Sequence, residues 1–259
     1  MKVYIMTDME GISGIDNYDM IQPDNARFEE SRLRLTEDVN AAVEGAIECG
    51  ARKVMVLDAH HKGEGNIIWE KIDPRATRDV RPNRNWWSSL DETFDATFVI
   101  GAHAMAGTIN AFLDHTQSSL AWYDYYVNGR KTGELGQWAL VAGHFGVPLV
   151  MMSGDEAAVV EAYAFFNPVE TAAVKRGVGR MSAVLVPLDE AHRRIRNAAK
   201  RAMGIVGKAK PYTVTFPAEI ILDLMRTEHA DSHAKVEGVE RTGPRRVRKI
   251  AKTALDILP

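Results

Sequence analysis

Four short apolar runs, separated by segments with a helical pattern, constrain the fold of this chain more than any other feature. The runs are Val3–Met6, Val54–Leu57, Thr97–Ile100 and Val147–Met152. Continuous apolar runs of this length are typical of strands that are buried on both faces of a parallel sheet. The chain therefore shows the alternation of strands and helices from which layered α/β proteins are built.

A long helix is predicted between the first two of these strands. Apolar residues recur at helical spacing from Phe28 to Ile47, and Gly50 follows as a typical helix-ending glycine. We expect the helix to begin after Pro23, with Asp24 as its N-cap. Strand, helix and strand together predict a βαβ unit, whose crossover should be right-handed.

Weaker signals place the remaining elements. Asn128-Gly129, which follows the aromatic segment 120–127, is a strong signal for a two-residue β-hairpin. Helices are predicted over about 135–144, after Gly154-Asp155, over 188–203 and over 244–257, and strands over 183–186 (alternatively a helix end) and 214–224. The predicted fold is a layered α/β/α arrangement with a mostly parallel sheet and a less clear C-terminal α/β portion. We expect one domain over residues 1–259, with a division into two lobes as the alternative.

Composition and charge favour a cytoplasmic protein without a nucleic-acid or membrane partner. The formal net charge is only −3, and no apolar run approaches the length of about 18 residues that a membrane-spanning helix needs. Acidic residues come too early at the N-terminus for a signal peptide. We expect Cys49, the only cysteine, to be a small buried residue at the end of a helix. We expect the cationic stretch 241–252 to be the exposed face of the last helix, with a subunit contact or an anion site as alternatives.

Acidic and histidine side chains follow the predicted strands at the points where the strands end. They are Asp8 and Glu10 after the first strand, Asp58, His60 and His61 after the second, His103 after the third and Asp155 after the fourth. Open α/β sheets bind their ligands beyond the carboxyl ends of the strands, so these side chains should meet at one edge of the sheet. Glu134, at the start of a predicted helix, can join them.

Carboxylates and imidazoles together are a ligand set for zinc or manganese. The carboxylates exceed what one zinc ion needs, which favours two ions about 3.5–4 Å apart that share a bridging carboxylate. Asp8 is the candidate for the bridge because it is closest to a rigid strand end. We expect Asp58 to orient a histidine rather than to bind a metal, and the site to be formed mainly by residues 1–160.

Each of these residues also has a simpler interpretation when it is taken alone. Asp8 and Glu10 can be loop carboxylates that accept hydrogen bonds from backbone N–H groups. His60 and His103 can each be a partly buried histidine with one hydrogen bond, and Glu134 can be an acid in the first turn of a helix. The coincidence of these residue types at three strand ends favours the metal site.

Several segments, in order along the first two thirds of the chain, resemble the D-aminopeptidase family of dinuclear zinc metallopeptidases. They are Thr7-Asp8-Met9-Glu10-Gly11-Ile12-Ser13-Gly14, Asp58-Ala59-His60, Gly101-Ala102-His103-Ala104, Gly133-Glu134-Leu135-Gly136, Gly154-Asp155 and Thr171-Ala172-Ala173-Val174-Lys175. Any one of them is weak evidence, but together, at compatible spacing, they are strong evidence.

The resemblance implies two zinc ions per subunit, for which Mn²⁺ or Co²⁺ can substitute. Asp8 would bridge the ions, His60 and His103 would complete one of them, and Glu10 and Glu134 would complete the other.

The resemblance also implies a reaction and an assembly. His115 matches the catalytic histidine of the family and would move a proton during catalysis, whereas by itself it can equally be a hydrogen-bonded loop histidine. The implied activity is the release of N-terminal amino acids, D-amino acids in particular, from short peptides by metal-activated water. The implied assembly is a homo-oligomer, possibly in the form of a ring.

Other functions stay open at this point. The segment 107–112 before His115 is apolar, so an amidase for non-peptide or β-amino acid amides is an alternative. A phosphoesterase can use the same metals, but the cations it needs are represented early in the chain only by Arg27, Arg32 and Arg34. A non-catalytic peptide-binding module would need the metal ligands without His115. Asp155 is a candidate acceptor for the substrate ammonium group, or otherwise the N-cap of the next helix.

Overall fold

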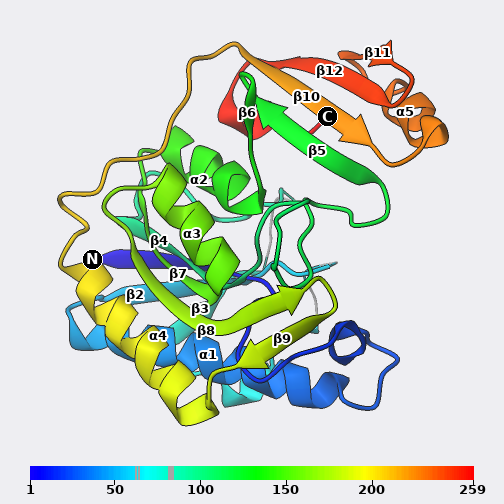
Figure 1. Ribbon diagram of the computed structural model, residues 1–259. Coiled ribbons are helices and arrows are strands. Elements are labelled where there is room, and N and C mark those ends of the chain that lie inside the picture. The colour runs from blue at the N-terminus through cyan, green and yellow to red at the C-terminus, as the bar shows by residue number, and fades with distance from the viewer. Residues whose placement is uncertain (62, 64, 81–84) are drawn as a thin grey trace.

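The computed structural model describes residues 1–61, 63, 65–80 and 85–259 of the chain, and it contains two β-sheets with helices packed between and against them (Figure 1). The larger sheet has the strand order β3-β2-β1-β4-β7-β8-β9. Its strands are β1 (Lys2–Thr7), β2 (Lys53–Asp58), β3 (Ala76–Arg78), β4 (Ala96–Ala102), β7 (Leu149–Asp155), β8 (Glu170–Gly179) and β9 (Ser182–Leu185). Every neighbouring pair is parallel except β8 and β9, which confirms the prediction of a mostly parallel sheet.

The order of the strands creates a switch point between β1 and β4. From β1 the chain adds β2 and β3 on one side, and it then returns to add β4, β7 and β8 on the other side. Connections leave the sheet in opposite directions at such a point and open a crevice at the carboxyl ends of the strands. Thr7 lies in register with both Asp58 of β2 and Ile100 of β4, so the loops after these three strands begin close to the same level.

Helices cover both faces of the large sheet. Helices α1 (Phe28–Glu48) and α4 (Leu188–Met203) lie together on one face, and α2 (Glu134–His144) and α3 (Glu156–Phe165) lie on the other (Figure 1). An apolar core fills the space on each side of the sheet. Gly45 of α1 permits the close packing of α1 on α4, because a Cβ atom there would lie 2.3 Å from the carbonyl oxygen of Arg196.

The smaller sheet packs on the far side of α2 (Figure 1). It has the antiparallel order β11-β12-β10-β5-β6. Its strands are β5 (Trp122–Val127), β6 (Arg130–Lys131), β10 (Ala218–Leu224), β11 (Val239–Gly243) and β12 (Arg246–Ala251). The short helix α5 (Thr227–His233) lies between β10 and β11, and single 3-10 turns cover Tyr18–Ile21, Trp69–Lys71 and Ala254–Asp256. The predicted hairpin is confirmed, with Asn128 and Gly129 at φ values of 48° and 78°.

The prediction of a final helix over 244–257 was wrong. This segment holds strand β12 and a 3-10 turn, and Val247 and Ala251 are the buried residues of the strand. Two arginines of β12 pair across the sheet, Arg246 with Asp223 and Arg248 with Glu219. Such cross-strand pairs form only when the neighbouring strand is in place, so the sequence pattern of this segment alone does not reveal them.

Two local predictions about α1 were also wrong. The helix begins at Phe28 with Arg27 at its N-cap position, rather than directly after Asp24. Cys49 is exposed rather than buried, because it occupies the C-cap position where the apolar stripe of α1 has already ended. Gly50 follows with a φ of 95°, as predicted for a helix-ending glycine. No helix in the described ranges is long and apolar enough to cross a membrane.

Candidate metal centre

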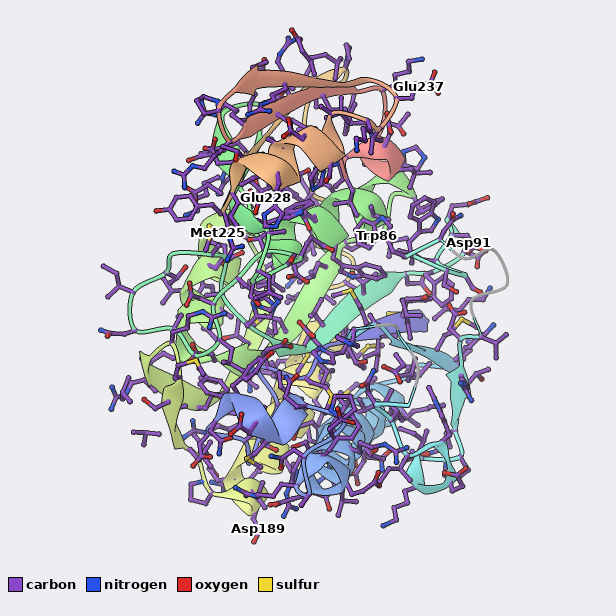
Figure 2. The ribbon with its side chains drawn as sticks, turned by 90° about the vertical axis from the view of Figure 1, so that its right-hand side faces the viewer. Trp86, Asp91, Asp189, Met225, Glu228 and Glu237 are labelled. Atoms are coloured by element: carbon purple, nitrogen blue, oxygen red, sulfur yellow. The ribbon has the colours of Figure 1, made fainter. Side chains whose placement is uncertain are left out.

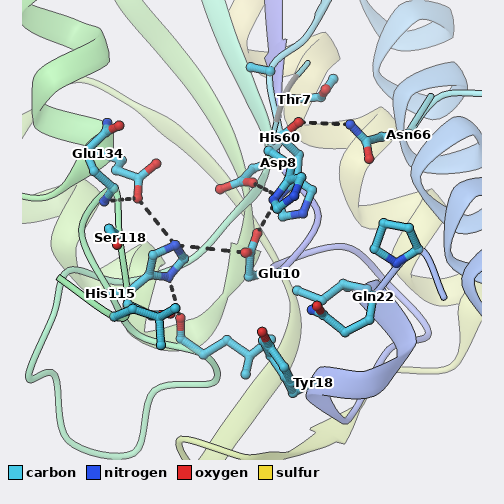
Figure 3. Close-up of a pocket in the computed structure, with 18 of the residues that line it drawn as sticks. Thr7, Asp8, Glu10, Tyr18, Gln22, His60, Asn66, His115, Ser118 and Glu134 are labelled. Atoms are coloured by element: carbon cyan, nitrogen blue, oxygen red, sulfur yellow. Dashed lines mark hydrogen bonds and ion pairs between the residues drawn. The ribbon is translucent and has the colours of Figure 1, made fainter. Parts of the chain in front are cut away.

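The five side chains predicted to bind metal lie together at the carboxyl edge of the large sheet. Figure 3 labels Asp8, Glu10, His60 and Glu134 among them. Asp8 and Glu10 are in the loop after β1, His60 follows β2, His103 follows β4, and Glu134 is the first residue of α2. The sheet therefore supplies four of these side chains from three adjacent strands, and the fifth comes from the helix that covers them.

Glycines hold the loop after β1 against the end of β4. The N–H of Gly11 donates to the carbonyl oxygen of Gly101 at 2.8 Å. A Cβ atom on Gly11 would lie 1.9 Å from the carbonyl oxygen of Ala102, and one on Gly101 would lie 2.1 Å from that of Asp8. Gly101 also has a φ of 85°, which other residues rarely adopt. This close approach of two backbones brings Asp8 within reach of His103.

The carboxylate of Asp8 lies between two histidines. Its Oδ1 atom is 2.8 Å from Nδ1 of His60, and its Oδ2 atom is 3.2 Å from Nε2 of His103. The two oxygens thus point at different imidazole rings, which is the arrangement that a carboxylate needs to bridge two cations.

Each of the two glutamates completes one side of this cluster. Glu10 Oε2 is 3.1 Å from His60 Nδ1, and Glu134 Oε1 is 3.4 Å from His103 Nε2. The ligand atoms of Asp8, Glu10 and His103 all lie within 4.8 Å of one another, as do those of His103, His115 and Glu134. Two overlapping sets of this size have the ligand types and spacing that zinc sites use.

The state of the buried polar atoms tests whether cations fit here. Glu10 Oε2 and His103 Nε2 are buried and make no hydrogen bond of acceptable geometry within the described part of the chain. His103 donates its Nδ1 proton to the carbonyl oxygen of Ala104 at 3.0 Å, so its Nε2 atom keeps a lone pair directed at the carboxylates. A buried lone pair and a buried carboxylate oxygen without donors are groups that a cation would satisfy.

The charges of the cluster shift its pKa values strongly. Burial raises the pKa of Asp8, but the rings of His103 and His60, which lie close to its two oxygens, outweigh burial and hold that pKa well below its usual range. Burial lowers the pKa of both histidines, but the neighbouring carboxylates raise it well above the ordinary value. These carboxylates are Glu10 and Asp8 at His60, and Glu134 and Asp8 at His103. The carboxylates thus attract protons onto the histidines, and metal ions would take the place of those protons.

His115 lies beside this cluster, on the loop that follows β4. Its Nε2 atom is 3.6 Å from Glu134 Oε1 and 3.9 Å from Glu10 Oε1. It donates its Nδ1 proton to the carbonyl oxygen of Leu113 at 2.8 Å, which leaves the Nε2 lone pair free to accept a proton. His61 is exposed, with its ring stacked on His60 at a centroid distance of 5.9 Å.

The cluster opens into a cavity of about 410 Å³. Asp8, Glu10, His60, His115 and Glu134 line one part of it. The remaining walls come from aromatic, polar and apolar residues that include Tyr18, Ile21, Gln22, Trp86, Leu113, Gln117, Ser118, Leu120 and Arg180. A concave site of this size with a few converging polar groups can hold a small substrate.

Asp58 supports the loop that carries His60. It accepts hydrogen bonds from the side chain of Asn66 at 2.8 Å and from its backbone N–H at 3.0 Å. Asn66 in turn donates to the carbonyl oxygen of His60 at 2.9 Å. The printed sequence shows Asn66 only as one polar residue in a glycine-containing loop, so its role depends on how the loop folds back.

Two further buried charged residues hold the metal loops, and neither role was predicted from the sequence, although Lys175 ends one of the family-like segments. Lys175 of β8 donates to the carbonyl oxygens of Glu10 at 2.8 Å and Ile15 at 2.9 Å. Burial lowers its pKa to about 7, although nearby carboxylates, Asp38 first among them, oppose the shift. Glu161 of α3 accepts from the N–H of Met105 at 2.8 Å, and burial raises its pKa to about 7. The one available signal was the motif Thr171–Lys175, which holds Lys175 but does not reveal its contacts.

The prediction that Asp155 accepts the substrate ammonium group was wrong. Asp155 is fully buried and accepts from the N–H groups of Phe112 at 2.9 Å and Gly177 at 2.8 Å, so both of its oxygens are occupied away from the cavity. Asp155 does occupy the N-cap position of α3, as the alternative predicted, but its side chain makes no capping bond to the helix. Asp155 instead ties the loop before His115 to strand β8.

A cluster of carboxylates and histidines at the switch point of a parallel sheet, open to a substrate-sized cavity, places this chain among the metal-dependent α/β enzymes. A model of the D-aminopeptidase family matches residues 1–259. The chain belongs to this family, which confirms the resemblance seen in its sequence motifs.

A sequence and a solved structure from Bacillus subtilis each match nearly the whole chain. The D-aminopeptidase of strain 168 is 32% identical over 260 residues, which cover 99% of this chain and 93% of that protein. The solved structure of the zinc-dependent D-aminopeptidase DppA, described as a self-compartmentalizing protease, superimposes with a TM-score of 0.93 and 31% identity over 99% of this chain and 94% of that one. The fold of the whole chain is therefore that of this family.

Proposed function

We propose that this protein is a zinc-dependent aminopeptidase that releases N-terminal amino acids, D-amino acids in particular, from short peptides. The observation that carries the proposal is the position of Asp8, whose two oxygens face His60 and His103 at the base of the cavity. The relatives named D-aminopeptidase, which match the whole chain, support the reaction class.

The chemistry of the ligands supports two zinc ions per subunit, with Mn²⁺ or Co²⁺ as substitutes. Asp8 would bridge them, and Glu10, His60, His103 and Glu134 would complete the two sites. When bound, such a pair lowers the pKa of a water molecule towards ~7 and polarises the scissile carbonyl. The division of the histidines and glutamates between the two ions stays a prediction.

His115 would move the proton that the reaction requires. The free lone pair on its Nε2 atom, close to Glu10 and Glu134, can take a proton from the attacking water and return it to the leaving amine. Since Asp155 is buried, the acceptor for the substrate ammonium group must come from the cavity. The carboxylates that line it are Asp8, Glu10 and Glu134.

The direct test compares D-Ala-D-Ala with L-Ala-L-Ala on metal-stripped enzyme, with and without added zinc. Zinc-dependent release of alanine from the D-isomer alone is the expected result. If neither peptide is cleaved while two zinc ions per subunit are bound, the aminopeptidase proposal fails, and amides of non-peptide or β-amino acids become the next substrates to assay.

The phosphoesterase alternative loses support from the structure. Arg27, Arg32 and Arg34 pair with glutamates of the same helix, and none of the three lines the cavity. Among the described residues that line the cavity, Arg180 is therefore the only arginine or lysine that could bind a phosphate.

We further propose that the protein is a cytoplasmic homo-oligomer, with a ring as the expected form of the assembly. The description of the Bacillus subtilis structure as self-compartmentalizing supports an assembly of identical subunits. Sedimentation velocity on the zinc-loaded protein tests this, and a monomer at micromolar concentration would contradict it.

A further inference from the structure

Arg180 is the one cationic side chain, histidines apart, among the described residues that line the cavity. It lies in the turn between β8, which ends at Gly179, and β9, which begins at Ser182. The other charged groups that line the cavity are the carboxylates at the metal cluster. The described lining of the cavity therefore combines carboxylates, where metals fit, with one fixed positive charge that forms no ion pair with them.

Two contacts hold Arg180 next to the loop of His115. The N–H of Leu113 donates to the carbonyl oxygen of Arg180 at 2.8 Å. The Nε atom of Arg180 donates to the carbonyl oxygen of Asp114 at 3.3 Å and lies 3.6 Å from the carboxylate of the same residue. Because Asp114 directly precedes His115, the guanidinium group is anchored one residue away from the proposed proton carrier.

These contacts use only one side of the guanidinium group. Oδ2 of Asp114 accepts from the N–H of Gly107 at 2.6 Å, so this carboxylate is shared with its own loop. Neither Nη atom of Arg180 reaches an oxygen acceptor in the described ranges, and the side chain is 43% exposed. Nη1 makes only a long contact of 3.6 Å with the sulfur of Met181, a weak acceptor that a carboxylate can replace. A guanidinium group fixed at Nε in this way can bind a carboxylate through two parallel hydrogen bonds.

We propose that Arg180 binds the C-terminal carboxylate of the substrate, so that the enzyme selects short peptides with a free carboxyl end. This inference rests on the proposed function, because it takes the scissile amide bond to lie at the metal cluster. An extended dipeptide or tripeptide spans roughly 7–11 Å, at about 3.5 Å per residue. A substrate of that length, with its scissile amide bond at the metal cluster, would carry its terminal carboxylate away from the metals, where Arg180 is the fixed cation among the described lining residues.

The kinetic test uses two substrates that differ only in the terminal charge, D-Ala-D-Ala and its C-terminal amide. The zinc-loaded enzyme should cleave the free acid with a kcat/KM about tenfold to a hundredfold higher than that of the amide. Arg180→Met should raise KM for the free acid by a similar factor and leave the amide unchanged, and Arg180→Lys should lie between them. Arg176→Met is the matched control and should behave like the parent, because Arg176 is an exposed arginine of the adjoining strand β8 that does not line the cavity.

Equal losses on both substrates in Arg180→Met would overturn the inference, since they would indicate a structural role. Equal cleavage of acid and amide by the parent enzyme would overturn it as well.

A binding experiment separates this inference from the proposed function. Zinc-loaded His115→Ala protein, with and without Arg180→Met, is titrated by calorimetry with the two peptides. The free acid should bind more tightly than the amide only when Arg180 is present. If the parent enzyme cleaves no peptide, the aminopeptidase proposal fails by itself, and this titration decides the role of Arg180. Equal affinity for acid and amide would show that Arg180 does not read the carboxylate.

Discussion

The imidazole rings of His103 and His115 stack face to face, with centroids 3.9 Å apart and planes 11° apart. Both rings donate Nδ1 protons to backbone carbonyls, so both Nε2 atoms are free, and they lie 3.4 Å and 3.6 Å from the same oxygen of Glu134. Only His103 is also close to Asp8, at 3.2 Å, and only His115 lines the cavity. We infer that His103 serves the metals and His115 serves the substrate.

His115→Ala should keep both zinc ions and lose most of its turnover. Removal of a positioned proton carrier typically lowers kcat by about 10² to 10⁴-fold, while the five ligands proposed for the metals stay in place. Metal content by mass spectrometry and kcat for D-Ala-D-Ala measure the two effects. His144→Ala, at an exposed histidine at the end of α2, is the control. An active His115→Ala enzyme would remove this assignment.

Lys175→Met should weaken zinc binding although Lys175 is not a ligand. The substitution leaves the carbonyl oxygens of Glu10 and Ile15 buried without their donor, at a cost of roughly 1–3 kcal/mol each, and it releases the loop that carries two ligands. Competition with a chelator measures the zinc affinity. Lys208→Met, at an exposed lysine, should bind zinc normally. Unchanged affinity in Lys175→Met would mean that the loop is held by its glycine contacts alone.

Stability should depend on pH through the pair of His192 and Asp38 between α4 and α1. The Nε2 atom of His192 lies 3.4 Å from Asp38 Oδ1, and this carboxylate raises the pKa of His192 above its ordinary value of 6.5. Glu37 acts in the same direction, while burial and Arg34 oppose it. A raised pKa in the folded state stabilises the fold fully below pH 6.5, and this contribution is lost as the pH rises through the folded-state pKa.

The experiment compares the melting temperatures of the parent protein and of His192→Gln from pH 6 to pH 9. The parent should be the more stable of the two at pH 6, and the difference should shrink as the pH rises. Terms common to both proteins, including the metal site, cancel in the difference. A constant difference across this range would show that the charge of His192 contributes nothing.

Gly101→Ala should disrupt the metal centre. The new Cβ atom would lie 2.1 Å from the carbonyl oxygen of Asp8, and the residue would keep a φ of 85°, a strain of roughly 1–3 kcal/mol by itself. Gly146→Ala provides the matched control, because its φ is 74° and no atom lies within 4 Å of the new Cβ. We expect urea unfolding to show a loss in both variants, with the larger loss and reduced zinc content only in Gly101→Ala. Equal losses would indicate that backbone strain alone decides the effect.

The parts of the fold that were predicted correctly are those whose pattern is local. Helix α4 has the predicted bounds of 188–203, because its apolar residues keep a helical period along sixteen positions. The hairpin at Asn128-Gly129 follows from the preference of these two residues for left-handed backbone. The prediction for the segment 244–257 was wrong because Arg246 and Arg248 have their hydrogen-bond partners on β10, more than twenty residues away in the sequence.

The sequence by itself determined which side chains carry the chemistry, since Asp8, Glu10, His60 and His103 each follow a strand end that its own apolar run defines. The tertiary structure decided how these side chains face one another and what holds them. Lys175 reaches the carbonyl of Glu10 across 165 positions, and Asp155 turns away from the cavity to bind the loop of Phe112. Contacts of this kind depend on strand order and register, which fix the distances between remote residues, whereas a local pattern fixes only the neighbours along one element.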